Sequence, residues 1–181
     1  MSAEKGIVFF HMQMFIKSSR LAAMGFVAGL LSVSGSALAA DNAPMVVTAE
    51  VAEVCDVTAS PLAFGAYNPL AATALGGTAT VTVTCTSGIL AGIELDDGLN
   101  ANTGSTADIP LRRINSGTNF LNYQLSQDSG HVTVWGGSPA TDVAHTGTGA
   151  PVALTVHGRI PALQNVPAGD YADTIGVLVV F

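Results

Sequence analysis

Apolar and polar residues alternate along several stretches of this chain, with the period of two that is typical of β-strands. The clearest stretch is 78–86 (TATVTVTCT), in which Val81, Val83 and Cys85 share one face and threonines occupy the other. We therefore expect Cys85 to point into a hydrophobic core. Threonine and valine also favour strands, and glycine marks the turns between them.

Turn-forming residues divide the rest of the chain after residue 40 into further short strands. The expected strands span residues 45–54, 61–68, 89–95, 109–115, 120–126, 131–135, 152–160 and 171–181, and residues 136–150 are rich in loop formers. This part of the sequence lacks the 3.6-residue period of a helix. Eight or nine short strands predict one all-β domain, built as a sandwich or a barrel.

The first 40 residues have the pattern of an export signal. Lys17 and Arg20 precede an apolar run at 21–31, and residues 37–39 (ALA) fit the small-residue pattern of a cleavage site. The apolar run has about 11 residues, short of the roughly 20 that an uncleaved membrane anchor needs. We therefore expect residues 1–39 to be a signal peptide and the protein to be exported.

The exported part is strongly acidic. Removal of residues 1–39 leaves the three arginines Arg112, Arg113 and Arg159, no lysine and twelve acidic residues, a net charge of about −9. This balance argues against nucleic acid as a partner, because phosphate binding requires clustered cations.

Both cysteines, Cys55 and Cys85, lie in the exported part. Two cysteines in an exported chain predict one disulfide, which would close a loop of about 30 residues and stabilise the fold by roughly 3–4 kcal/mol. A metal site or a catalytic thiol is the weaker alternative, because the sequence has no CxxC motif and no histidine at ligand spacing from either cysteine. We expect no metal and no cofactor.

The histidines do not indicate an enzyme. His131 and His157 fall in expected strands and His145 in an expected loop, and the chain contains none of the common hydrolase, zinc-protease or phosphate-loop motifs. We interpret the three histidines as surface or packing residues and expect no catalytic activity.

Three other features admit a functional and a structural interpretation. Residues 96–102 (DDGLNAN) are rich in carboxylates but lack the spacing of a calcium-binding EF-hand, so we expect a turn. Arg112 and Arg113 could bind an anion, although pairing with the many acidic residues is the simpler expectation. Tyr123 and Trp135 could form a carbohydrate platform, but core packing is favoured.

The expected strands nearest the two ends, 45–54 and 171–181, are the most informative. A strand at a free end is not tied to its own sheet by loops on both sides, so it can pair with another molecule at low entropic cost. The alternative is that residues 45–54 pair within their own domain.

An ordered set of motifs follows the expected strands. The set comprises Cys55-x-Val57, Leu62-x-Phe64-Gly65-x-Tyr67, Thr80-x-Thr82-x-Thr84-Cys85, Leu121-x-Tyr123-x-Leu125, Trp135-Gly136, Val156-x-Gly158-Arg159-Ile160-Pro161, Gly169-Asp170-Tyr171-x-Asp173-Thr174 and the final Phe181. In this order the motifs resemble the spore coat protein U domain family, which includes the subunits of Csu-type (archaic) chaperone–usher pili. The resemblance covers the whole exported part.

The resemblance implies an incomplete immunoglobulin-like β-sandwich that lacks its last strand and is completed by a donor strand. It places an N-terminal donor strand at 40–54 and the pilin domain at 55–181. The side chains implied to enter a neighbouring subunit are Met45, Val47, Ala49 and Val51. The edge implied to receive the chaperone or the donor includes Ile175, Val177, Val179 and Phe181.

The function implied is that of a structural subunit of a surface pilus, which supports adhesion or biofilm formation. Its partners would be a periplasmic chaperone, an outer-membrane usher and other copies of itself or related pilins. It would pass through the periplasm to the cell surface. Two alternatives stay open, a secreted spore-coat-like or matrix protein that does not polymerise and an adhesin that binds a surface directly.

Overall fold

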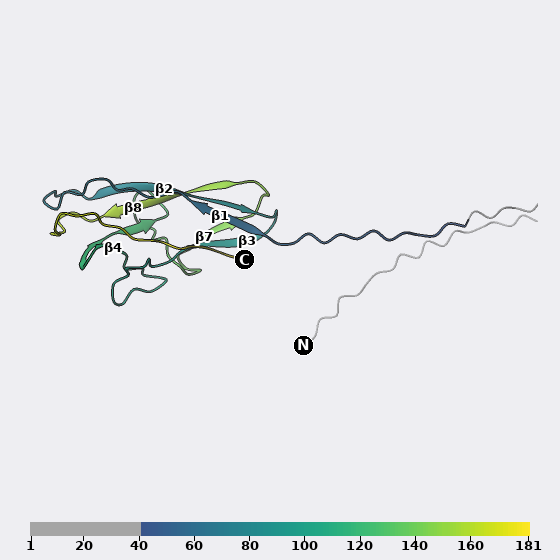
Figure 1. Ribbon diagram of the computed structural model, residues 1–181. Helices are drawn as coiled ribbons and strands as arrows, with labels where there is room; N and C mark the ends of the chain where they lie inside the picture. The colour runs from purple at the N-terminus through teal and green to yellow at the C-terminus, as the bar shows by residue number, and fades with distance from the viewer. Residues whose placement is uncertain (1–40) are drawn as a thin grey trace, which may run out of the picture. The chain divides into compact units, whose positions relative to one another are not determined.

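The computed structural model describes residues 41–181, so the predicted signal peptide at 1–39 lies outside the described part of the chain. The chain divides into two units, Met1–Val47 and Thr48–Phe181. All the strands described below belong to the second unit (Figure 1).

Nine strands and no helix form within residues 41–181. They are β1 (Cys55–Ala59), β2 (Leu75–Cys85), β3 (Leu90–Leu95), β4 (Arg113–Ser116), β5 (Asn119–Asn122), β6 (Gln124–Ser126), β7 (Val143–Thr146), β8 (Val152–Ile160) and β9 (Val177–Val180). All pairings are antiparallel. The predicted all-β class is therefore confirmed.

The strands make two sheets with a hairpin beside them. One sheet has the order β1-β2-β8-β6, the other β7-β3-β9, and β4 pairs with β5 alone. Side chains from both sheets, among them Val81 and Ile93, belong to one buried apolar cluster, so the two sheets enclose a common core as in a sandwich.

The long strands follow the alternation in the sequence. On β2, Val81, Val83 and Cys85 are at most 2% exposed, whereas the threonines between them are only half-buried. Strand β8 begins and ends where the pattern at 152–160 predicts, and Val81 of β2 lies opposite Leu154 of β8. A long alternating segment can bury one face only in one register, which makes these strands predictable.

Several expected strands are absent or displaced. Residues 61–68 and 131–135 form no strand, and 171–181 contributes only the short β9. The expected loop at 136–150 contains β7, so His145 lies in a strand. His131 lies outside any strand and has a φ of 55°, because the chain turns around Asp128, whose carboxylate accepts hydrogen bonds from the backbone N–H groups of the two residues after His131.

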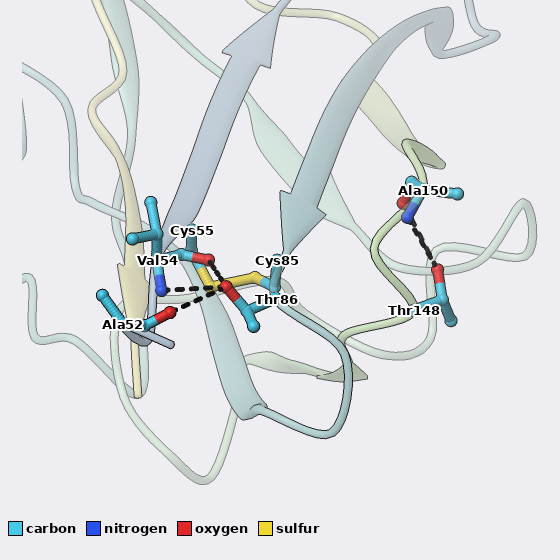
Figure 2. The surroundings of a disulfide bond; sticks show 7 residues. All are labelled: Ala52, Val54, Cys55, Cys85, Thr86, Thr148 and Ala150. Atoms are coloured by element: carbon cyan, nitrogen blue, oxygen red, sulfur yellow. Dashed lines mark hydrogen bonds between the residues drawn. A yellow bond between two sulfur atoms is a disulfide. The ribbon is translucent and has the colours of Figure 1, made fainter. Parts of the chain in front are cut away.

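Residues 41–54 form no strand either, in contrast to the strand expected at 45–54. Every side chain in this segment, which we call the arm, is exposed. Backbone hydrogen bonding to the rest of the domain begins at Val54, whose carbonyl oxygen accepts a hydrogen bond from Thr86 N. Thr86 Oγ1 accepts from Val54 N at 3.2 Å and lies 3.3 Å from the Ala52 carbonyl oxygen (Figure 2).

Cys55 and Cys85 face each other directly across β1 and β2, and their sulfurs are joined at 2.03 Å (Figure 2). Cys55 is the first residue of the first strand, and the arm immediately precedes it. The disulfide therefore attaches the beginning of the sandwich to β2 at the point where regular pairing starts.

We expect the double variant Cys55→Ala/Cys85→Ala to unfold more easily, with a free energy of unfolding lower by about 3 kcal/mol. The reason is that the disulfide limits the freedom of the unfolded chain over a loop of about 30 residues. Urea denaturation followed by circular dichroism measures the change. Adding a reductant to the unaltered protein should reproduce it, and an unchanged midpoint in both experiments would show that the disulfide does not stabilise the fold.

Candidate functional site: an apolar groove between the sheet edges

A cavity of about 950 Å³ lies between the two sheets and is open along one side. We call it the interlayer groove. Its floor consists of core side chains from several strands, namely Ala79, Val81, Leu95, Leu121, Leu125, Val156 and Ile160. One wall is the segment 59–69, which follows β1, and the other is the segment 166–177, which leads into β9.

Each wall of the groove continues an outer strand, because Ala59 is the last residue of β1 and Val177 the first residue of β9. Strand β1 is the outer strand of its sheet and β9 the outer strand of the other. Within the described residues, no strand pairs with either outer edge. The segment 60–69 forms no strand, so the apolar floor is flanked there by backbone that belongs to no sheet, an arrangement that can accept an added strand.

Two opposed glycines position the first wall. Gly77 of β2 lies directly opposite Gly158 of β8, and together they leave room for the side chains of Leu62 and Phe64. A Cβ atom at Gly158 would come within 2.8 Å of both side chains. The absence of side chains at the two glycines therefore allows Leu62 and Phe64 to lie flat against the sheet.

The same wall ends at Tyr67. Its hydroxyl donates to the Pro161 carbonyl oxygen at 3.0 Å and accepts from Gln164 N at 2.8 Å. These two bonds join segments nearly 100 residues apart in the sequence. The wall is therefore fixed to the end of β8 without being part of a sheet.

Backbone hydrogen bonds hold the second wall against the body of the domain. Asn115 and Ala172 exchange two backbone bonds of 3.0 Å, and the carbonyl oxygens of Thr174 and Gly176 accept from Leu99 N and Asp96 N.

Asp173 is the principal side-chain anchor of this second wall. Its Oδ2 accepts a hydrogen bond of 2.7 Å from the Tyr123 hydroxyl, and its Oδ1 accepts from Asn100 Nδ2 and Leu99 N. Burial raises the pKa of Tyr123, and the hydrogen bond to Asp173 raises it further, so the hydroxyl stays protonated and donates. The Tyr123 ring also packs edge-on against Phe64, with centroids 6.0 Å apart, so one residue connects both walls.

The arginines do not pair with carboxylates as expected. The fully buried Arg112 donates from Nη2 to the Leu95 carbonyl oxygen and from Nε to that of Asp96, both at 2.8 Å. Burial lowers its pKa, while the nearby Tyr123 and three aspartates act in the opposite direction. Arg113 also donates to carbonyl oxygens, and its guanidinium lies 4.0 Å from the Phe120 ring.

The remaining candidate features have structural roles. Asp96 Oδ1 accepts from Gly98 N, and Asp97 Oδ2 accepts from Ser105 Oγ, so these carboxylates stabilise the turn at 96–105. Trp135 is 1% exposed and donates from Nε1 to the Ile93 carbonyl oxygen. Trp135 and Tyr123 are therefore core residues, as the sequence favours, and do not form a surface platform.

The residues implied by the family resemblance occupy different environments. Met45, Val47, Ala49 and Val51 are all exposed and belong to no strand. Of the four residues implied at the receiving edge, Ile175 and Val177 line the interlayer groove. Val179 packs against the core, and Phe181 is exposed and does not line the groove.

Sequence reasoning missed most of the groove. The sequence predicts a short strand at 61–68 that runs into a turn, whereas in the structure Leu62 and Phe64 alternate with exposed residues without forming a strand. The alternation of apolar and small residues at 61–68 is the sequence signal that could have indicated a groove wall without a neighbouring strand. The contact between Tyr123 and Asp173 joins positions 50 residues apart and has no local signal.

The chain is similar to known proteins over most of its length. A family model described as Spore Coat Protein U domain matches residues 41–178. Protein U of Myxococcus xanthus is 36% identical over 172 residues, which cover 89% of this chain and 96% of that relative.

A solved structure shares the fold. It is the CsuC-CsuE chaperone–tip adhesion subunit pre-assembly complex from the archaic chaperone-usher Csu pili of Acinetobacter baumannii, with a TM-score of 0.54 and 23% identity. The match covers 72% of this chain and 40% of the matched chain, so our protein spans less than half of that chain's length. This likeness confirms the type of all-β fold that was predicted.

We expect Tyr123→Phe to lower the free energy of unfolding by about 1.5–3 kcal/mol, because it removes a hydrogen bond to a charged and partly buried acceptor. Urea denaturation measures the change. Tyr171→Phe is the matched control, since the Tyr171 hydroxyl donates only to the Pro167 carbonyl oxygen within the same wall. A loss no greater than that of the control would show that the contact with Asp173 does not anchor the wall.

Proposed function

Because the chain belongs to the Spore Coat Protein U domain family, we propose that it is a structural subunit of a surface pilus. Copies would join by donor-strand exchange, in which the donor segment 40–54 of one copy fills the interlayer groove of the next. The observation that carries this proposal is the groove itself, an apolar cavity of about 950 Å³ walled by the segments 59–69 and 166–177, which adjoin two outer strands.

The chemistry of the arm matches that of the groove. Met45, Val47, Ala49 and Val51 share one face of an extended segment, so all four can point into the groove while the intervening residues face solvent. Burial of a side chain such as Val47 stabilises the complex by about 1.5–3 kcal/mol. The backbone of the inserted segment would hydrogen-bond to the free edge of β9.

The exposure of the arm favours exchange over pairing within one domain. Met45, Val47 and Val51 are 79–85% exposed, and Thr86 bonds the chain only as far back as Ala52. An apolar segment that is exposed in the free subunit gains stability when another copy covers it. A secreted protein that does not polymerise would have no use for this arrangement.

The proposal extends to assembly and location. A periplasmic chaperone would first cover the edge that includes Ile175, Val177, Val179 and Phe181, and an outer-membrane usher would exchange the chaperone for the arm of the next subunit. The fibre would then stand on the cell surface and support adhesion or biofilm formation. Support comes from the likeness in fold to a solved complex of a chaperone with a tip adhesion subunit of archaic chaperone-usher pili. Direct binding to a surface, as in an adhesin, is the second candidate role.

The two faces of the arm should differ in their tolerance of charge. We expect Val47→Asp to reduce fibre formation at least tenfold, because it places a carboxylate in an apolar groove. Thr48→Asp, on the opposite face, should assemble like the unaltered protein. Electron microscopy of fibres and gels of unheated samples measure assembly. Equal effects of the two substitutions would contradict insertion of this face.

Removal of residues 40–52 tests the source of the donor strand. Co-expressed with its chaperone, the shortened protein should form a stable one-to-one complex that does not polymerise. A synthetic peptide of residues 41–54 should displace the chaperone, and the same peptide with Val47→Asp should not. A full-length protein that is a stable folded monomer without a chaperone would overturn the proposal.

A further inference from the structure

A second depression, of about 560 Å³, lies on the other face of the β6–β8 pair. Gln124 of β6 and Arg159 of β8 face each other across this pair, and both are exposed. Their chain neighbours Leu125 and Ile160 are buried and line the interlayer groove. We call this depression the Arg159 pocket; its polar lining residues are Asn102, Arg112, Asn122, Tyr123, Gln124, His131 and Arg159.

The charge of the Arg159 pocket is opposite to that of the chain. Two of the three arginines that follow residue 40, Arg112 and Arg159, line it, and none of the twelve acidic residues does. No hydrogen bond or ion pair to another described residue holds the exposed Arg159 guanidinium. A cationic, donor-rich pocket on so acidic a protein indicates an anionic ligand.

Several polar atoms of the pocket residues lack a protein partner. Arg112 Nη1 and His131 Nδ1 are buried without one, which is rare in folded proteins. The backbone of His131 adopts the left-handed region, a conformation that often marks a functional position. Asn102 uses its Oδ1 to accept from Thr103 N, so its amide N–H groups remain available as donors.

The lining residues also indicate the class of anion. An arginine guanidinium binds a carboxylate through two parallel hydrogen bonds. The Gln124 amide can donate and accept, and the Asn102 amide can donate, which suits hydroxyl groups. The Asn122 amide already donates to Gln164 Oε1 and offers its oxygen as an acceptor. The volume is within the range of about 300–1,000 Å³ that is typical of small-molecule sites and is larger than a phosphate ion requires.

We propose that the Arg159 pocket binds a carboxylated sugar, such as a uronic acid unit of a polysaccharide. Arg159 would hold the carboxylate, the amides would bind the hydroxyls, and the ring would lie against Pro161. The site lies on the face of the sheet opposite the interlayer groove, so it does not depend on donor-strand exchange.

Saturation-transfer-difference NMR with glucuronate and the full exported chain tests this site, because the method detects binding to monomers and to fibres alike. We expect saturable binding of glucuronate and at least tenfold weaker binding of glucose, which lacks the carboxylate. Arg159→Gln should weaken glucuronate binding at least tenfold. Arg159→Lys should bind glucuronate with an intermediate affinity, since lysine keeps the positive charge but lacks the planar guanidinium group.

Two further variants control for charge and folding. Ala150→Asp changes the net charge by the same amount as Arg159→Gln and should bind glucuronate normally. Ala150 lies two residues before β8 begins at Val152, and the strand separates it from Arg159 by roughly 25 Å. Gln124→Glu, at an exposed position in the pocket, should abolish binding while circular dichroism stays unchanged. Equal binding of glucose and glucuronate, full binding by Arg159→Gln, or displacement of glucuronate by an equal concentration of inorganic phosphate would each overturn the proposal.

Discussion

Along the outer edge of β9 the backbone N–H and C=O groups have no partner strand within the described residues, and apolar side chains line the cavity beside them. Polar backbone groups next to an apolar surface are costly to leave unpaired, whereas an extended segment with alternating apolar side chains satisfies both at once. On our proposal, this constraint explains why the exposed arm at 41–54 has the alternation of a strand without forming one.

The open side is held in shape by contacts that do not involve its occupant. Gly77 and Gly158 let Leu62 and Phe64 lie against the sheet, while Asp173 fixes the opposite wall through Tyr123 and the turn near residue 99. Walls that are already positioned reduce the ordering cost of binding a strand. The disulfide and Thr86 complete this organisation, because they fix the beginning of β1 and bond the chain before it only as far back as Ala52.

The alternation that forms the groove also forms the second site. On β8, Val156, Gly158 and Ile160 point inward, so Arg159 must point to the opposite face. On our two proposals, the apolar face would bind other copies of the protein and the cationic pocket a small anion. The two faces share strands and one side chain, Tyr123, which lines both cavities.

The sequence by itself determined the all-β class, the pairing face of β2 and the limits of β8, because an alternating segment of nine or more residues carries its burial pattern locally. It did not determine the conformation of His131, because the turn around Asp128 removes this residue from the expected strand. It also did not determine that residues 143–146 form β7, since their composition does not favour a strand and pairing with β3 decides it. Residues 61–68 have the pattern of a strand, but a strand also needs a partner edge. Only the tertiary structure decided that the partner is missing there, and that Tyr123 and Asp173, 50 residues apart, hold the gap open. Local patterns specify which side of a segment is buried, whereas pairing and long-range hydrogen bonds depend on what the whole fold brings alongside.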